Sequence, residues 1–135
     1  MFDWLTSLFS KYGASPASKG AYWEKVAARA LKKEGCRIVA RNWKRPGARG
    51  ELDIVARDRT ALVFVEVRSR GAAALVSGYE SIGRHKKEVL RATALAYLSG
   101  LKNRPHTYRF DVVEISYRSA KDYDLRHFKN IPLFG

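Results

Sequence analysis

Residues 50–70 read GELDIVARDRTALVFVEVRSR, and they carry the clearest structural pattern of the chain. Two apolar runs, Glu51–Ala56 and Leu62–Val67, are rich in the β-branched and aliphatic residues that strands favour. Each run also contains an acid, Asp53 or Glu66, where an apolar side chain would pack more easily. The stretch therefore predicts a β-hairpin that carries two carboxylates in its most hydrophobic part.

The turn of this hairpin predicts which residues face one another. A tight turn at the polar residues 58–60 places Asp53 opposite Glu66 and Glu51 opposite Arg68. Directly opposed side chains share a face, with Cβ atoms roughly 4.5–5.5 Å apart. Two carboxylates at that separation repel one another unless one is protonated or a cation lies between them. Mg²⁺ binds oxygen ligands and keeps several waters, so two carboxylates are enough to hold it.

Two simpler interpretations of the hairpin remain open. A register shifted by one residue would put the acids on opposite faces of the sheet. Charged residues also occur on edge strands, where they oppose aggregation, and Glu51 with Arg68 would then be an ordinary cross-strand ion pair.

The rest of the chain predicts an α/β domain. Helical spacing of apolar residues predicts helices over 21–34 and 85–98, and alternating or apolar runs predict strands over 36–43 and 107–116. With the hairpin, the order is αβββαβ, which predicts a mixed sheet flanked by helices. We expect a flexible or docked N-terminal arm at 1–19, one domain at 20–116, and a C-terminal tail at 117–135 without an assigned element.

The charge of the chain points to a polyanionic partner. Its 135 residues contain 26 Lys and Arg against 13 Asp and Glu, which gives a net charge of +13. Nucleic acid is the first expectation and an anionic membrane surface the second. The single Cys36 excludes an internal disulfide and suits a cytoplasmic location. No apolar run is long enough to cross a bilayer, so we expect no stable membrane insertion.

Many of the basic residues lie close to the acidic hairpin in the sequence. We expect these basic residues to form a rim around the acids that binds phosphates. Such a rim would contact the backbone of a nucleic acid rather than its bases. Trp43 is expected in the core, with stacking on an unpaired base as the alternative. The predicted nucleic-acid-binding residues are Arg41, Lys44, Arg45, Arg49, Arg70, Arg84 and Lys87.

Several of these features occur together in one known family. A helix-borne Glu24, GELDIVARD, VFVEVRSR, a lysine early in the following helix, and YRFDVVEI resemble the YraN-like family of predicted nucleases. That family belongs to the restriction-endonuclease-like, PD-(D/E)XK superfamily, and the resemblance covers residues 20–116. It implies an αβββαβ core, hydrolysis of phosphodiester bonds with Mg²⁺ or Mn²⁺, and a DNA or structured nucleic-acid substrate. We expect DNA before RNA, with branched, damaged or single-stranded DNA as the candidate structures.

The resemblance also implies roles for individual residues. Asp53 and Glu66 match the metal-binding acids of the superfamily, and the carbonyl of Val67 is a further possible ligand. Glu24 matches a glutamate of the first helix that binds a second metal or orients the attacking water. The sequence has Arg68 where the superfamily has a catalytic lysine.

Three further points follow for the function. Either Arg68 or Lys86 would serve the role of the missing lysine. The alternative function is a non-catalytic nucleic-acid-binding protein that keeps the fold, and a third is an interaction module that uses the arm and the tail. A homodimer would suit paired cuts across a duplex.

Overall fold

The computed structural model describes residues 16–72 and 82–134, with the side chains of α2 described from residue 19 onward. The predicted N-terminal arm therefore lies largely outside the described residues. The described elements are, in order, α2 (Pro16–Lys33), β1 (Arg37–Lys44), β2 (Glu51–Asp58), β3 (Ala61–Gly71), α3 (Arg84–Ser99), β4 (Tyr108–Tyr117) and β5 (Tyr123–Phe128).

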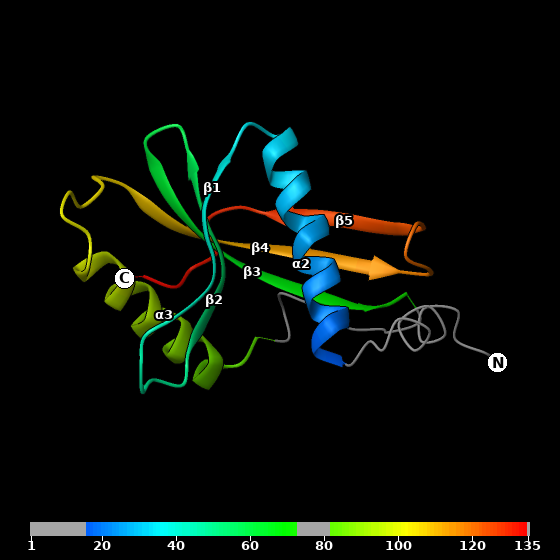
Figure 1. The fold of residues 1–135 in the computed structure, drawn as a ribbon, viewed down its shortest axis with the longest axis horizontal. Helices are drawn as coiled ribbons and strands as arrows, with labels where there is room; N and C mark the ends of the chain where they lie inside the picture. The colour runs from blue at the N-terminus through cyan, green and yellow to red at the C-terminus, as the bar shows by residue number, and fades with distance from the viewer. Residues whose placement is uncertain (1–15, 73–81, 135) are drawn as a thin grey trace.

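The strands form one mixed sheet in the order β1-β2-β3-β4-β5 (Figure 1). β3 and β4 pair in parallel, and the other neighbours pair antiparallel. The chain reaches the parallel β4 through α3, as a parallel pair requires a crossover connection. The predicted αβββαβ order is confirmed, and β5 adds a strand within the segment that the sequence left unassigned.

The two helices cover opposite faces of the sheet. Trp23 of α2 packs in one cluster with Val63 and Val65 of β3, while Leu90 of α3 packs in another with Phe64. Successive strand residues point to opposite faces, so a continuous apolar run such as that of β3 supplies both clusters. Burying β3 on both sides makes any ionised group within it costly, which matters for Glu66.

The hairpin of β2 and β3 has the predicted register over most of its length. Its pairs run from Asp58–Ala61 to Ile54–Val65, and Arg59 adopts the left-handed conformation in the turn with φ 57°. The direct pairing of Asp53 with Glu66 is not part of this ladder, although both residues are described. At this point the N–H of Val67 in β3 donates to the Asp53 carboxylate and not to a backbone carbonyl of β2. The regular pairing of the two strands therefore ends there.

A buried charged network fixes β5 against the sheet. The carboxylate of Asp111 is fully buried, and it accepts hydrogen bonds from Arg109, from His127 of β5 and from the backbone N–H of Asn130. The other ring nitrogen of His127 lies 2.6 Å from the Glu34 carboxylate. Burial lowers the pKa of His127, but the hydrogen bonds to the two carboxylates outweigh burial and raise it above 6.5. The ion pair between Arg109 Nε and Asp111 Oδ1 has a length of 3.0 Å.

Candidate metal centre and its basic surroundings

The centre lies where β2 and β3 stop pairing. Asp53 Oδ2 accepts a 2.9 Å hydrogen bond from the backbone N–H of Val67, which directs the carboxylate toward β3. This contact sets Asp53 beside Glu66, the residue that precedes Val67 in β3. The hypothesis that the two predicted acids lie together is thus supported, although the contact runs through the Val67 N–H. The role predicted for the Val67 carbonyl stays a prediction.

Glu66 is the most perturbed acid of the centre. Its side chain is 6% exposed, and Oε2 is buried without a hydrogen-bond partner. Burial, followed by the negative charge of Asp53 and a hydrogen bond shared with it, raises the pKa of Glu66 to about 8. Two cations act against this shift, Lys86, whose Nζ lies 3.7 Å from Oε2, and Arg68.

Two further carboxylates complete the cluster. One oxygen each from Glu24 of α2 and from Glu51 and Asp53 of β2 lies within 4.8 Å of the others. Burial and the charges of Asp53 and Glu51 raise the pKa of Glu24 to about 7, and Arg41 acts against the shift. Glu24 reaches the centre because its neighbour Trp23 is buried between α2 and the sheet.

Asn42 of β1 joins the two outer acids. With its amide oriented so that the nitrogen faces the carboxylates, it donates to Glu24 Oε2 and Glu51 Oε1, both at 2.8 Å. Asn42 has a φ of 52°, and asparagine is one of the few residues that adopt this conformation at low cost. Glu51 also forms a 3.5 Å ion pair with Lys44. Its side chain therefore contacts the neighbouring strand β1.

The donors of this centre match a hard divalent cation. All are carboxylate oxygens from α2, β2 and β3, the ligand type that Mg²⁺ and Mn²⁺ prefer. Glu66 Oε2 is buried and has no hydrogen-bond partner, so it is available as a metal ligand. Burial, and after it the repulsion between neighbouring carboxylates, raises the pKa values of Glu24 and Glu66, and a bound divalent cation would act against both shifts. The residues present therefore fit such an ion.

Sequence reasoning missed Glu51 and Asn42 as members of the centre. Glu51 is two residues before Asp53 on the same strand, a spacing that places both side chains on one side of it. This spacing is visible in the sequence, but the predicted hairpin register pairs Glu51 with Arg68 instead. Asn42 carried no usable signal, because its position depends on a left-handed residue in an edge strand.

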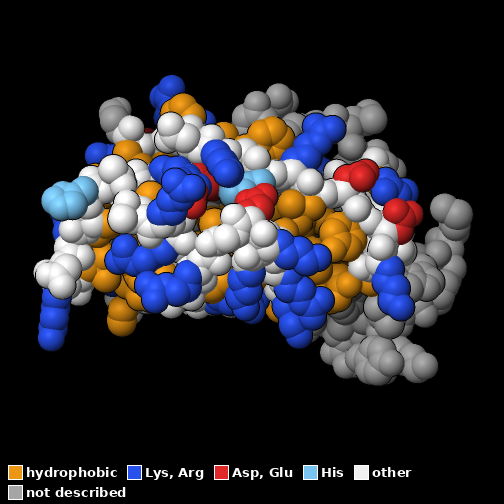
Figure 2. Space-filling view, turned by 90° about the horizontal axis from the view of Figure 1, so that it is seen from above, with side chains coloured by type: hydrophobic (Ala, Val, Ile, Leu, Met, Phe, Trp, Pro, Cys, Tyr) orange, Lys and Arg blue, Asp and Glu red, His pale blue; other side chains and the backbone are white. Residues whose placement is uncertain are grey.

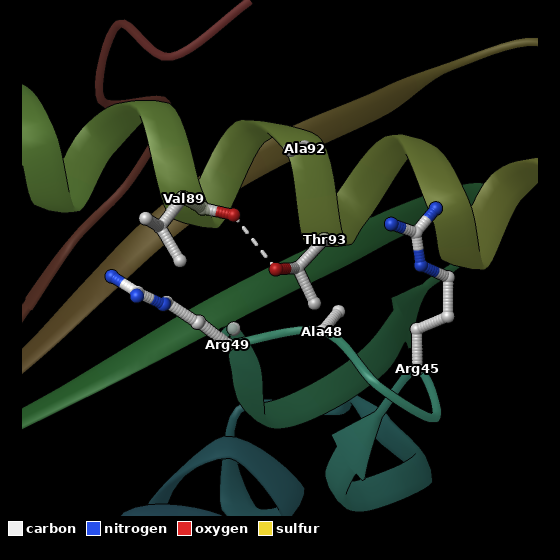
Figure 3. Close-up of a pocket in the computed structure, with 7 residues that line it drawn as sticks. Arg45, Ala48, Arg49, Val89, Ala92 and Thr93 are labelled. Carbon is white, nitrogen blue, oxygen red and sulfur yellow. Dashed lines mark hydrogen bonds between the residues drawn. The ribbon is translucent and has the colours of Figure 1, made fainter.

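A pocket with two arginines lies next to the acids. It has a volume of about 240 Å³ between the β1–β2 loop and α3, and it ends at Gly50, the residue before Glu51. Figure 3 shows Arg45 and Arg49 on either side of it, with Ala48 and Thr93 between them. A Cβ at residue 50 would lie 1.8 Å from Thr93 Oγ1, so the loop approaches α3 this closely only with glycine there.

The other predicted basic residues lie around the same part of the fold. Arg84 and Lys87 line a second pocket beside Pro132 and Leu133, while Arg70 is half-buried near the end of β3. Trp43 packs edge-on against Tyr97, in agreement with the predicted core role. Lys and Arg side chains far outnumber Asp and Glu on the face shown in Figure 2. Within the described residues, no helix has the length and apolar character needed to span a membrane.

Comparison with known proteins identifies the family. The model of the uncharacterised protein family UPF0102 matches residues 23–115, which include the four acids and Lys86. A UPF0102 protein of Chlorobaculum tepidum is 39% identical over 126 residues, covering 90% of this chain and 96% of the relative. One from Pelotomaculum thermopropionicum is 41% identical over 112 residues, covering 82% and 92% respectively. The chain therefore belongs to the uncharacterised protein family UPF0102.

Proposed function

We propose that this protein is a metal-dependent nuclease that hydrolyses phosphodiester bonds of DNA. The observation that carries the proposal is the cluster of Glu24, Glu51, Asp53 and Glu66, which α2, β2 and β3 bring together inside a chain of net charge +13. Four carboxylates at one place lower the stability of the fold unless a cation joins them. A cationic surface around them attracts a polyanion at the same time.

Each acid has a distinct part in the proposed reaction. A divalent ion held by Asp53 and Glu66 would supply positive charge beside the reacting phosphate and a bound water of lowered pKa. Glu24 lies beside Asp53, so its carboxylate is in a position to accept a proton from the attacking water. Glu51 and Asn42 hold Glu24 in place through the bridging amide.

The basic side chains stabilise the charge of the phosphate. Lys86 lies at the start of α3 with 47% of its side chain exposed, so its ammonium contacts both Glu66 and a substrate in the open part of the site. It fits the role of the missing lysine on this ground. Arg68 remains charged and does not act as a base, but its guanidinium donates hydrogen bonds to phosphate oxygens.

The decisive experiment measures cleavage and metal binding with the same set of proteins. Wild type, Asp53→Asn and Glu66→Gln are incubated with labelled single-stranded, duplex and branched DNA in Mg²⁺, Mn²⁺ or chelator. We expect metal-dependent cleavage by the wild type and a loss of at least about 100-fold in both variants. Glu88→Gln is the matched control, because Glu88 is an exposed acid of α3. Equal cleavage by all four proteins would assign the activity to a contaminant and refute the proposal.

A non-catalytic nucleic-acid-binding protein is the second candidate, and Arg68 at the lysine position is the observation that favours it. This candidate predicts DNA binding that is unaffected by Asp53→Asn and calorimetry that shows no uptake of Mn²⁺. The homodimer and the cytoplasmic location remain predictions alongside both functions.

A further inference from the structure

A second basic groove lies at the other end of the β1–β2 pair from the carboxylates. It has a volume of about 590 Å³ and is open to solvent between the β2–β3 turn, the start of β1 and the loop before β4. Among the described residues that line it there is no Asp or Glu. The groove is lined chiefly by Arg37, Arg57, Arg59, Arg104, Asn103 and His106.

Two of these arginines face each other across the sheet. Arg37 of β1 and Arg57 of β2 are directly paired, so their side chains leave the same face. Like charges in directly opposed positions destabilise a sheet, and an anion between them removes the repulsion. Arg59 follows in the turn and Arg104 comes from the facing loop, so four guanidinium groups surround one opening.

The nearest acid in the sequence has another partner. Asp58 lies between Arg57 and Arg59, and its Oδ2 accepts a 3.1 Å hydrogen bond from Arg109 Nη2. Arg109 connects Asp58 to the buried Asp111 network behind the sheet. The positive charge of the groove is thus left for an external anion.

An exposed edge strand connects this groove to the metal centre. β1 is at one edge of the sheet, and its exposed residues run from Arg37 at the groove through Arg41 to Lys44, which pairs with Glu51. Because β1 has a bulge between Ile38 and Ala40, Arg37 and Arg41 pair with Arg57 and Ile54, which are three residues apart on β2, or about 10 Å at roughly 3.3 Å per strand residue. That length corresponds to roughly three base pairs of duplex at 3.4 Å per step.

We propose that this second groove binds the phosphate backbone of double-stranded DNA several base pairs from the bond that is cut. The inference rests on the proposed nuclease function and adds the substrate class, a duplex segment that lies along β1 and spans both basic regions. The arginines contact the backbone by charge-assisted hydrogen bonds and read no bases, so the groove adds affinity and orientation without sequence preference.

The test measures how DNA affinity depends on salt. Each lost phosphate contact lowers the slope of log K against log salt concentration by about 0.9. The variant Arg57→Gln/Arg104→Gln removes two contacts and keeps the turn residue Arg59. The control Lys121→Gln/Arg126→Gln removes two exposed charges at or beside β5, the opposite edge of the sheet. Binding of a labelled duplex is followed by fluorescence anisotropy in chelator, so that no cleavage occurs.

We expect the groove variant to lose about 1–2 units of slope and the control variant less than about 0.5. Equal changes in both variants, or none in the groove variant, would overturn the inference. A normal thermal unfolding temperature in each variant confirms that the fold is intact. Cleavage is assayed separately, so a wild type that cleaves while the groove variant keeps its slope refutes the groove alone. A wild type that never cleaves refutes the nuclease proposal, while the slopes still decide whether the groove binds DNA.

Discussion

Replacing Glu66 by Gln should raise the stability of the metal-free protein at alkaline pH. The carboxyl of Glu66 has a pKa of about 8 in the fold against an ordinary value of 4.5. Between these values the folded state holds a proton that the unfolded state has lost, so the free energy of unfolding falls as pH rises. Above about pH 8 the full cost of a buried negative charge beside Asp53 is present.

The expected magnitude follows from the shift in pKa. The change from 4.5 to about 8 corresponds to roughly 5 kcal/mol at 1.36 kcal/mol per pKa unit. Part of this free energy comes from the repulsion between Glu66 and Asp53, which the two side chains can reduce by moving apart. We therefore expect Glu66→Gln to raise the free energy of unfolding by roughly 2–4 kcal/mol at pH 9. At pH 4.5 and below, both proteins carry a neutral side chain there, and the gain should vanish.

Urea unfolding at a series of pH values with a chelator present measures this gain. The exposed Glu88→Gln should follow the wild type at every pH, because Glu88 lies outside the acidic cluster. Adding Mn²⁺ at about 100 times its dissociation constant should stabilise the wild type by about 2.7 kcal/mol and the Glu66→Gln protein much less. A variant that is less stable than the wild type at pH 9 in chelator would refute the reasoning about this buried acid.

Three other substitutions test separate features. Gly50→Ala should lower the free energy of unfolding by roughly 1–3 kcal/mol because its Cβ overlaps Thr93 Oγ1, and adding Thr93→Ala should restore part of the loss in the same urea assay. His127→Gln should cost roughly 3–5 kcal/mol at pH 5.5. Because the pKa of His127 is raised, the stabilisation by its positive charge is complete below pH 6.5 and is lost as pH rises through the raised value. The cost of His127→Gln should therefore shrink toward pH 9. Replacement of the exposed His85 by Gln should have no effect at either pH. Lys86→Ala should slow single-turnover DNA cleavage by about 10–100-fold, and a variant with an unchanged rate would remove Lys86 from the proposed reaction.

The parts of the fold that were predictable are those governed by local pattern. The hairpin register followed from its polar turn, and the pairs from Asp58–Ala61 to Ile54–Val65 agree with it. β5 was missed because its residues are mostly exposed or half-buried, and its His127 faces a buried carboxylate that belongs to another strand. A strand stabilised by a charged partner has no apolar periodicity from which to recognise it.

The candidate site likewise contains residues that local pattern predicts and residues that depend on contacts between distant segments. Asp53 and Glu66 were predictable because acids interrupt apolar strands, which leaves a visible anomaly in the sequence. The raised pKa of Glu24 was not, since it depends on how α2 lies against the sheet and on charges from β2. The second basic groove was also missed, because its arginines come from three separate segments and converge only in the folded sheet.

The buried carboxylate of Asp111 links β4 to the segment that follows it in the chain. The family match ends at residue 115, yet the carboxylate of Asp111 depends on His127 and Asn130 beyond that limit. A homologous chain that stopped after β4 would hold an ionised acid in apolar surroundings with only Arg109 beside it. We therefore expect a neutral residue at the position of Asp111 in any relative that lacks the last strand, so that the two features are gained and lost together during evolution.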